Sequence, residues 1–305
     1  MNHSVAVVLG AISAGIGGDL FVRGVVGLAH WARVSAGIIG ATVAAFATSS
    51  PELSVAISSA LDQKPQISLG DVLGSNVVNV ALILALALLI AGVQSSRDSI
   101  KRDFPAALVT PIVIGLLSLD GVLSQLDGFV LLSIFLVWLI AVILEARRQQ
   151  SASDEVLGEP RSWLAVILCV VGLGLLILAA HLIVGGATGI ALAFGVDEFV
   201  IGATIVAVGT SMPELATTIV SRLRGHEEVA LGTILGSNIF NSLWVVGVAA
   251  AISPIAVNWQ EVSVALVFGV LTVILTFPTS RGRIERRRGA VLLALYLVYL
   301  VIIIN

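Results

Sequence analysis

Two stretches of the sequence, 162 positions apart, decide its fold: GATVAAFATSSPEL at Gly40–Leu53 and GATIVAVGTSMPEL at Gly202–Leu215. Each stretch places a threonine, a serine, a proline and a glutamate inside strongly apolar sequence. Proline lacks a backbone N–H, and its ring clashes with the carbonyl one turn earlier, so we expect each helix to break there. Irregular backbone at membrane depth is tolerated only where protein buries it or where it lines a cavity. The stretches therefore predict two broken helices around an internal site, with carbonyls freed near Ala45, Ala47 and Thr48 in one and near Ala207, Gly209 and Thr210 in the other.

The composition around these stretches is that of an integral membrane protein. The chain has 305 residues, of which 58% are hydrophobic and 11% charged, whereas a soluble domain carries about 25% charged residues. Its long apolar runs favour helices over the alternating pattern of an outer-membrane barrel. Cys169 is the single cysteine, so no internal disulfide can form. Since each crossing needs about 20 apolar residues, the sequence predicts ten membrane helices, at about 4–29, 35–61, 67–93, 104–119, 125–146, 162–192, 197–223, 228–252, 260–278 and 288–304.

The distribution of basic residues predicts the orientation of these helices, because cytoplasmic loops are enriched in lysine and arginine. One alternating set of connections holds 14 of the 16 basic residues, including the run Arg281–Arg288. The other set holds only Lys64, and Arg23 lies near the end of the first helix. We therefore expect both termini outside, the arginine-bearing loops in the cytoplasm and the protein in a plasma or inner membrane.

The two stretches belong to a longer internal repeat. Residues 40–79 align with 202–241 without a gap, and 19 of the 40 positions are identical. Five predicted helices separate the copies, and because five is odd, the second copy crosses the membrane in the opposite sense. Such inverted-topology repeats are typical of secondary transporters. The predicted fold is therefore an all-α membrane protein of two inverted five-helix repeats, 1–146 and 162–305, joined by a short cytoplasmic linker at 147–161.

Glu52 and Glu214 are the strongest indication of function. A charged residue at the centre of a bilayer costs at least about 2.5–3.5 kcal/mol, and no basic residue in the repeat cores could pair with either glutamate. Related by the repeat, the two should meet near its pseudo-two-fold axis and supply two negative charges. Carboxylate, hydroxyl and carbonyl oxygens suit calcium, whereas the imidazole and thiolate ligands of softer metals are absent from both motifs.

The second part of each repeat reads LGDVLGSNVVN at Leu69–Asn79 and LGTILGSNIFN at Leu231–Asn241. Ser75 and Asn79 are four residues apart and so share a helix face, as do Ser237 and Asn241. Each face can direct hydroxyl and amide oxygens at the neighbouring glutamate. Asn76 and Asn238 fit better as hydrogen-bonding contacts between helices. Asp19 and its repeat mate His181 differ chemically, so a packing role suits them better than a shared ligand role.

TSSPEL and TSMPEL, followed by GSNVVN and GSNIFN, resemble the two alpha repeats of the sodium/calcium exchanger family, and the resemblance covers nearly the whole chain. The resemblance implies four ion sites at the centre of the second, third, seventh and eighth helices. It also implies that the first and sixth helices slide across this rigid core to switch access. Glu52 and Glu214 would be the calcium carboxylates. At the position of Asn241, some members of the family, including potassium-dependent ones, carry aspartate. The other ligands that it implies are the carbonyls of Thr48 and Thr210, the sodium-site residues Ser49, Ser211, Ala45 and Ala207, and the completing residues Ser75, Ser237, Asn79 and Asn241.

The predicted function is exchange of sodium for calcium by alternating access, with calcium/proton exchange at the same two glutamates as the alternative. A channel would need no inverted symmetry. No nucleophile–base pair suggests an enzyme, since the four histidines lie outside the motifs. We expect no bound cofactor and no nucleic-acid partner: the partners are the two transported ions and the lipid bilayer, and one chain contains a whole site in principle.

Overall fold

A computed structural model describes residues 3–152, 162–193 and 207–304, almost all of them helical. The first half contains α1 (His3–Ala32), α2 (Ala36–Ile39), η1 (Gly40–Ala44), α3 (Ala45–Thr48), α4 (Ser50–Leu61), α5 (Gln66–Val77), η2 (Val78–Leu84), α6 (Ala85–Ile90), β1 (Val93–Gln94), α7 (Arg97–Leu117), β2 (Val122–Leu123) and α8 (Gln125–Ala152). The second half contains α9 (Ser162–Ala193), α11 (Ala207–Thr210), α12 (Met212–Leu223), α13 (Glu227–Ile239), η4 (Phe240–Val245), α14 (Val246–Ile252), β3 (Ile255–Ala256), α15 (Trp259–Thr276), β4 (Arg283–Ile284) and α16 (Arg286–Ile304).

The helices are those of a multi-pass membrane protein. By length and composition, five described helices can cross a membrane, or six if the bent pair Ala36–Thr48 and Ser50–Leu61 is counted as one span. Every predicted apolar segment overlaps described helix, although 197–206 lies outside the described residues. The helix α7 starts at Arg97, earlier than predicted, and continues through Pro105 and Pro111. The helix α8 runs on through 147–152, the first part of the predicted linker. The count of ten membrane helices remains a prediction.

Elements of the two halves correspond at the spacing of the sequence repeat. The π-helical segment η2 begins at Val78 and η4 begins at Phe240, which is 162 positions later. The strands β1 at Val93 and β3 at Ile255 have the same spacing. A π-helix is rare and occurs mostly as short insertions at functional sites. Its occurrence at matching positions shows that the halves share local backbone as well as sequence.

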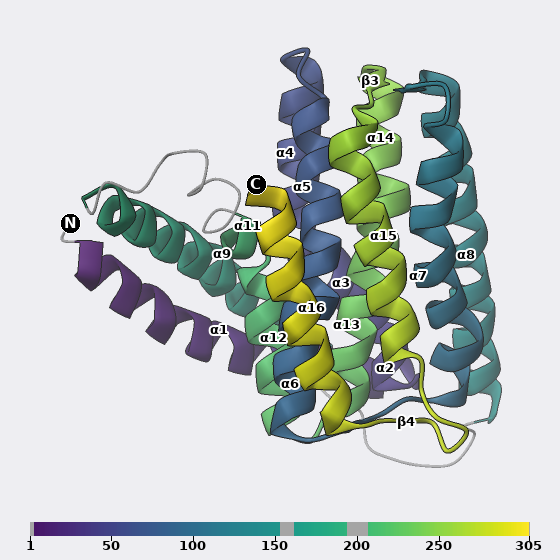
Figure 1. Ribbon diagram of the computed structural model, residues 1–305. Coiled ribbons are helices and arrows are strands. Elements are labelled where there is room, and N and C mark those ends of the chain that lie inside the picture. The colour runs from purple at the N-terminus through teal and green to yellow at the C-terminus, as the bar shows by residue number, and fades with distance from the viewer. Residues whose placement is uncertain (1–2, 153–161, 194–206, 305) are drawn as a thin grey trace.

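Two short strand pairs, absent from the all-α prediction, link the halves. Strand β1 pairs with β4, and β2 pairs with β3, both antiparallel. In Figure 1, β3 lies at the upper end of the bundle and β4 at the lower end, so the repeat-related strands β1 and β3 lie at opposite ends. The segments between helices leave backbone N–H and C=O groups without helical partners, and pairing satisfies them. We call these the β1–β4 end and the β2–β3 end of the molecule.

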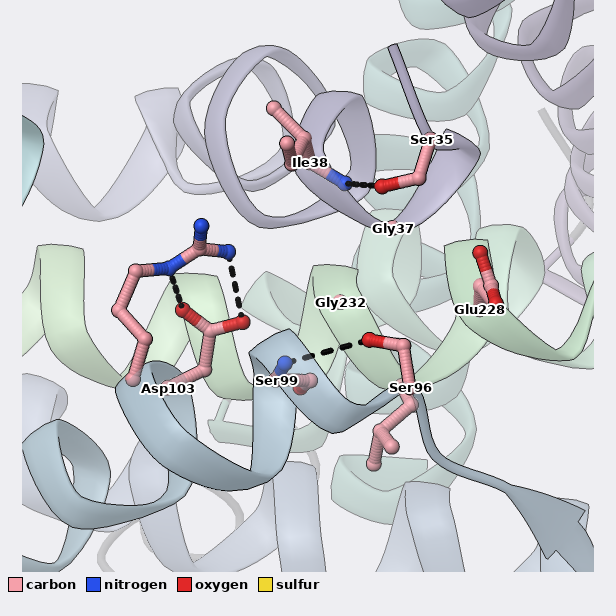
Figure 2. A pocket seen from close by; sticks show the side chains of 10 residues that line it. Ser35, Gly37, Ile38, Ser96, Ser99, Asp103, Glu228 and Gly232 are labelled. Atoms are coloured by element: carbon pink, nitrogen blue, oxygen red, sulfur yellow. Dashed lines mark hydrogen bonds and ion pairs between the residues drawn. The ribbon is translucent and has the colours of Figure 1, made fainter. Parts of the chain in front are cut away.

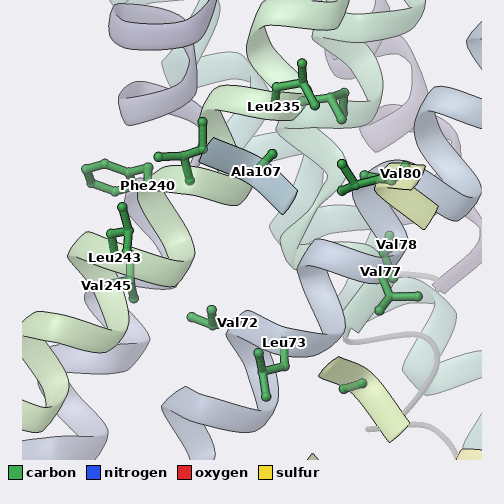
Figure 3. Packing of buried hydrophobic residues seen from close by; sticks show 14 of the residues in the cluster. Val72, Leu73, Val77, Val78, Val80, Ala107, Leu235, Phe240, Leu243 and Val245 are labelled. Carbon is green, nitrogen blue, oxygen red and sulfur yellow. The ribbon is translucent and has the colours of Figure 1, made fainter. Parts of the chain in front are cut away.

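The buried core lies among the helices of the repeat motifs. Figure 3 shows side chains from α5 and η2 meeting those from α13 and η4, among them Val72, Val77, Leu235 and Phe240. Many large apolar side chains elsewhere are exposed, for example Ile12 on α1, Val137 on α8 and Val301 on α16. Exposed apolar patches of this extent mark an interaction surface in a soluble protein, but here they form the surface that lipid covers.

The helices α1 and α9 form a separate pair. In Figure 1 they lie side by side, tilted away from the main bundle, and they pack together along most of their length. Glycines at Gly10, Gly17 and Gly24 recur every seven residues on the contact face of α1. A Cβ atom at Gly24 would lie 2.6 Å from the backbone nitrogen of Cys169. Small residues permit this close approach of helices in membranes, and the pair joins the bundle through an ion pair between Asp19 on α1 and Arg224 after α12.

Candidate ion-binding site

The predicted helix breaks are present at both copies of the motif. Ser49 separates α3 from α4 with φ −86° and ψ 11°, and Ser211 separates α11 from α12 with φ −83° and ψ 11°. Pro51 and Pro213 follow in the first turn of the next helix, where the missing N–H removes no helical hydrogen bond. At the first break the chain bends by 44°. The breaks bring the polar residues of the motifs into the centre of the bundle.

The expectation of free carbonyls is wrong for Ala45 and Ala47. The carbonyl of Ala45 accepts the N–H of Ser49 at 3.0 Å and the hydroxyl of Thr48 at 3.3 Å. The carbonyl of Ala47 accepts the hydroxyl of Ser50 at 2.7 Å. Side-chain hydroxyls therefore cap the broken turn in place of the missing backbone donors. The side chain of Ala207, the repeat mate of Ala45, lies outside the described residues.

Glu214 is held by hydroxyl groups from both halves of the chain. Its Oε1 accepts hydrogen bonds from Ser49 Oγ at 3.1 Å and from Ser237 Oγ at 3.2 Å. Ser237 Oγ also lies 3.4 Å from Thr48 Oγ1. All four side chains are fully buried. One oxygen of Glu214 is thus fixed by neutral donors, while its Oε2 is buried without a hydrogen-bond partner.

Glu52 lacks the mirror-image arrangement. The repeat mates of the Glu214 partners are Ser211 and Ser75, and their hydroxyl oxygens are buried but make no hydrogen bond. Both carboxylate oxygens of Glu52 are also buried without a partner, although only 1% of the residue is exposed. The two glutamates are close enough to interact electrostatically. The site is therefore asymmetric, with hydroxyl donors in place around Glu214 and none around Glu52.

Four asparagines cross the boundary between the halves. Asn79 Nδ2 donates to Asn238 Oδ1 at 3.0 Å, and Asn241 Nδ2 donates to Asn76 Oδ1 at 3.4 Å. The repeat relates these two hydrogen bonds to each other, because Asn79 corresponds to Asn241 and Asn76 corresponds to Asn238. Each fixes which way its amide faces and leaves Asn79 Oδ1 and Asn241 Oδ1 buried without a partner. Asn76 and Asn238 thus join helices, as the sequence predicts, and they also orient the amides of Asn79 and Asn241.

The unpartnered atoms fit a cation. A buried polar group left without a partner costs about 1–3 kcal/mol, and more if it is charged, so native structures contain few of them. Several such atoms belong to predicted ligands: Glu52 Oε1 and Oε2, Glu214 Oε2, Ser75 Oγ, Ser211 Oγ, Asn79 Oδ1 and Asn241 Oδ1. Others belong to described residues that are not predicted ligands, among them Ser68, Thr217 and Trp138. Among the described residues, no group of three or more histidine, cysteine or acidic side chains could hold a metal ion. Two carboxylates with hydroxyl and amide oxygens instead form a donor set for a hard cation.

One partly buried acidic residue of this region lies outside the predicted ligand set. Asp71, on α5, interacts electrostatically with Glu52 and forms a side-chain hydrogen bond with Thr210. Its repeat mate is Thr233, in a stretch that is otherwise closely similar. That single charged difference between LGDVLGSN and LGTILGSN is the pattern that could have drawn attention to Asp71.

A second polar cluster lies near the β1–β4 end, away from these glutamates. Asp103, in the second turn of α7, accepts two hydrogen bonds from the Arg102 side chain, at 2.8 and 3.0 Å. Figure 2 shows Asp103 beside Ser96 and Ser99 of the same region. Ser96 caps the same helix by accepting the N–H of Ser99 at 3.2 Å. The space beside them is about 10 Å³, the size of a single water molecule. This cluster serves to begin α7 and to pack it against α13.

The family model described as sodium/calcium exchanger protein matches residues 3–144 and 164–305, nearly all of both halves. The chain belongs to the sodium/calcium exchanger family. It is 35% identical over 256 residues to the inner membrane protein YrbG of Escherichia coli strain K12, covering 80% of this chain and 79% of that protein. It is 26% identical over 337 residues to the sodium/calcium exchanger MaX1 of Methanosarcina acetivorans, covering 97% and 96%.

Solved structures of this family share the fold. A structure of the sodium-calcium exchanger NCX_Mj superposes with a TM-score of 0.84 at 29% identity, covering 98% of each chain. The chain is therefore a membrane-embedded member of a family of ion antiporters, and it is not of an enzyme family.

Proposed function

We propose that this protein exchanges sodium for calcium across the membrane by alternating access. The observation that carries the proposal is the pair of fully buried glutamates, Glu52 and Glu214, with three of their four carboxylate oxygens unpartnered. Two carboxylates carry the charge that one calcium ion neutralises. The relatives named as sodium/calcium exchangers support the same pair of ions.

The proposed ligands are those that the resemblance to the exchanger family implies. Calcium takes 6–8 oxygen ligands, and Glu52 and Glu214 would supply its carboxylates. The remaining set comprises the carbonyls of Thr48 and Thr210, the sodium-site residues Ser49, Ser211, Ala45 and Ala207, and the completing residues Ser75, Ser237, Asn79 and Asn241. Of these, the Ala45 carbonyl already accepts two hydrogen bonds, so it would bind sodium only after the Thr48 hydroxyl turned away. Sodium is favoured over protons as the counter-ion because hydroxyl oxygens from both repeats lie beside the carboxylates, and a proton would need no such additional ligands.

Coupling follows from the cost of buried charge. An empty site leaves two carboxylates unpaired in a medium of low dielectric constant, which is unfavourable. A barrier that slides across the site would have to pass over that charge. Bound calcium, or two or three sodium ions, removes most of it, so switching is favourable only when the site is loaded. The α1–α9 pair, which packs more extensively within itself than against the bundle, suits the role of the sliding element.

The proposed topology has ten membrane helices in two inverted five-helix repeats. The opposite placement of β1 and β3 supports the inversion. The β1–β4 end would face the cytoplasm, because the connection that contains β4 carries the arginines between Arg281 and Arg288. Both termini and the β2–β3 end would face outward, in an inner or plasma membrane.

The proposal is tested by calcium uptake into proteoliposomes loaded with sodium, with equal pH maintained on both sides by buffer and protonophore. We expect uptake that requires internal sodium and generates a membrane potential. Uptake that ignores sodium but follows an imposed pH gradient would overturn sodium coupling and assign calcium/proton exchange to the same two glutamates. Calcium conductance without a counter-ion would overturn antiport altogether.

A further inference from the structure

Asp71 lies on α5 between the predicted ligand Ser75 and the β2–β3 end of the molecule. Asp71 and Ser75 are four residues apart in α5 and therefore lie on one face of the helix. At a rise of 1.5 Å per residue, Asp71 lies about 6 Å closer to that end than Ser75. Unlike the fully buried Ser75, Asp71 is partly exposed. The face thus runs from an accessible carboxylate to a buried hydroxyl of the candidate site.

Asp71 interacts with the part of the site that contains Glu52, where the carboxylate oxygens have no hydrogen-bond partner. It interacts electrostatically with Glu52 and is hydrogen-bonded to Thr210, which is also partly exposed. Its Oδ2 atom is buried without a partner, as are both carboxylate oxygens of Glu52 and the hydroxyl of Ser75. These unpartnered oxygens lie on the side of the site where no side-chain donor forms a hydrogen bond with Glu52. Glu214 has its hydroxyl partners in place, and the matching position on α13 is Thr233 rather than an aspartate.

The second repeat offers no equivalent charge. Thr233 occupies the matching position on α13, is fully buried and carries only a hydroxyl group. If Asp71 served only to accept a hydrogen bond from the Thr210 hydroxyl, an asparagine would serve equally well. An asparagine would also avoid placing a third negative charge close to Glu52. The carboxylate is therefore explained better by a ligand that carries positive charge.

We propose that Asp71 forms an access site for calcium between the β2–β3 end and Glu52, on one face of the membrane only. The site rests on the proposed function and deepens it. Its ligands would be the Asp71 carboxylate and the hydroxyl of Thr210, with Glu52 next along the path. A carboxylate in a constricted path raises the local concentration of cations and their rate of association. Calcium capture from the β2–β3 face would then be more efficient than capture from the opposite face.

The first test compares Asp71→Asn with the wild-type protein in right-side-out and inside-out membrane vesicles. Asparagine keeps an acceptor for Thr210 and removes only the charge. We expect the KM for calcium to rise roughly tenfold on the β2–β3 face, with the maximal rate and the KM on the other face unchanged. Thr233→Val is the matched control in the second repeat and should alter neither KM value. An unchanged KM on the β2–β3 face, or an equal change on both faces, would overturn the access site.

The second test measures equilibrium binding of calcium alone to purified protein, so that it does not depend on transport. In the Glu214→Gln variant, Glu52 and Asp71 remain as the neighbouring carboxylates. Adding Asp71→Asn should weaken the residual calcium binding by about tenfold, since each tenfold corresponds to about 1.4 kcal/mol, whereas adding Thr233→Val should not. Equal binding with and without Asp71→Asn would overturn the site. Failure of sodium-driven uptake in the wild-type protein, with this binding difference intact, would overturn the proposed function instead.

Discussion

At the scale of single residues, the two glutamates are equivalent in sequence and different in structure. Glu214 accepts hydroxyl hydrogen bonds from Ser49 and Ser237, whereas Glu52 accepts none from side chains. The mates of those serines, Ser211 and Ser75, are buried but make no side-chain hydrogen bond. An alternating-access protein exposes its site to one face at a time, so two inverted repeats cannot have the same conformation simultaneously. The asymmetry is what one stable state of such a protein requires.

Replacing either glutamate should abolish calcium transport. Glu52→Gln and Glu214→Gln each remove one of the two charges, and a contact between opposite charges in a partly buried site is worth kilocalories per mole. We expect the affinity for calcium to fall by at least about tenfold per lost carboxylate, measured by calcium uptake and by equilibrium binding. Ser50→Ala is the control, because the Ser50 hydroxyl donates to the carbonyl of Ala47 and is not a predicted ligand. Normal transport in both glutamine variants would contradict the assigned site.

The asparagines that orient the ligands should matter almost as much as the ligands. Asn238 accepts from Asn79 and donates to the carbonyl of Asn76 at 3.0 Å. Asn238→Ala removes the acceptor that fixes the amide of Asn79, whose oxygen is then free to turn away from the site. Loss of such an outer-shell partner typically costs about 10–100-fold in metal affinity. Calcium binding should fall in that range while the protein stays monodisperse in detergent, and unchanged affinity would reduce Asn238 to a packing contact.

At the scale of elements, the sequence predicts the broken helices but not their local backbone. The prolines and the repeated motif identify the breaks at Ser49 and Ser211, because proline acts on its own helix. The π-helical turns at η2 and η4 have no such local cause in the sequence, since they depend on how side chains of neighbouring helices fit together. The strands β1 to β4 are each two residues long, and their pairing depends on the distant segment that lies opposite.

The close packing of α1 and α9 gives a prediction for these two helices. Gly24→Val places a side chain against the backbone of Cys169 and Ala165, 2.6–2.8 Å from the built Cβ, and overpacking of this kind costs about 1–3 kcal/mol. We expect a lower Tm in detergent and slower calcium uptake, because the pair should move as one body. Gly15→Val is the matched control on the same helix, since a Cβ there meets nothing within 4 Å. Equal effects of the two variants would mean that the glycine contacts do not hold the pair together.

At the scale of the whole molecule, much of the architecture is predictable because the sequence contains it twice. The repeat predicts that Glu52 and Glu214 lie near each other, and in the structure both are fully buried and interact electrostatically. What the repeat cannot predict is which conformation each half adopts, since an alignment of the copies shows their residues and not the contacts that those residues make. The role of Asp71 therefore depends on the asymmetry between Glu52 and Glu214, which only the folded chain shows. The carbonyls of Ala45 and Ala47 are a similar case, because nearby hydroxyls satisfy them in ways that the proline alone does not indicate.

The two strand pairs have a consequence for how the molecule is assembled. Strands β1 and β2 belong to the first half and β3 and β4 to the second, so both pairs join one half to the other, as do the asparagine contacts at the centre. Two separately translated chains, 1–152 and 153–305, contain every one of these complementary surfaces. When co-expressed, we expect an affinity tag on one to recover the other from membranes, with sodium-dependent calcium uptake restored; recovery of the tagged chain alone would contradict this. In genetic terms, the protein would then be two subunits joined in one gene, and dividing that gene into two would still yield a working transporter.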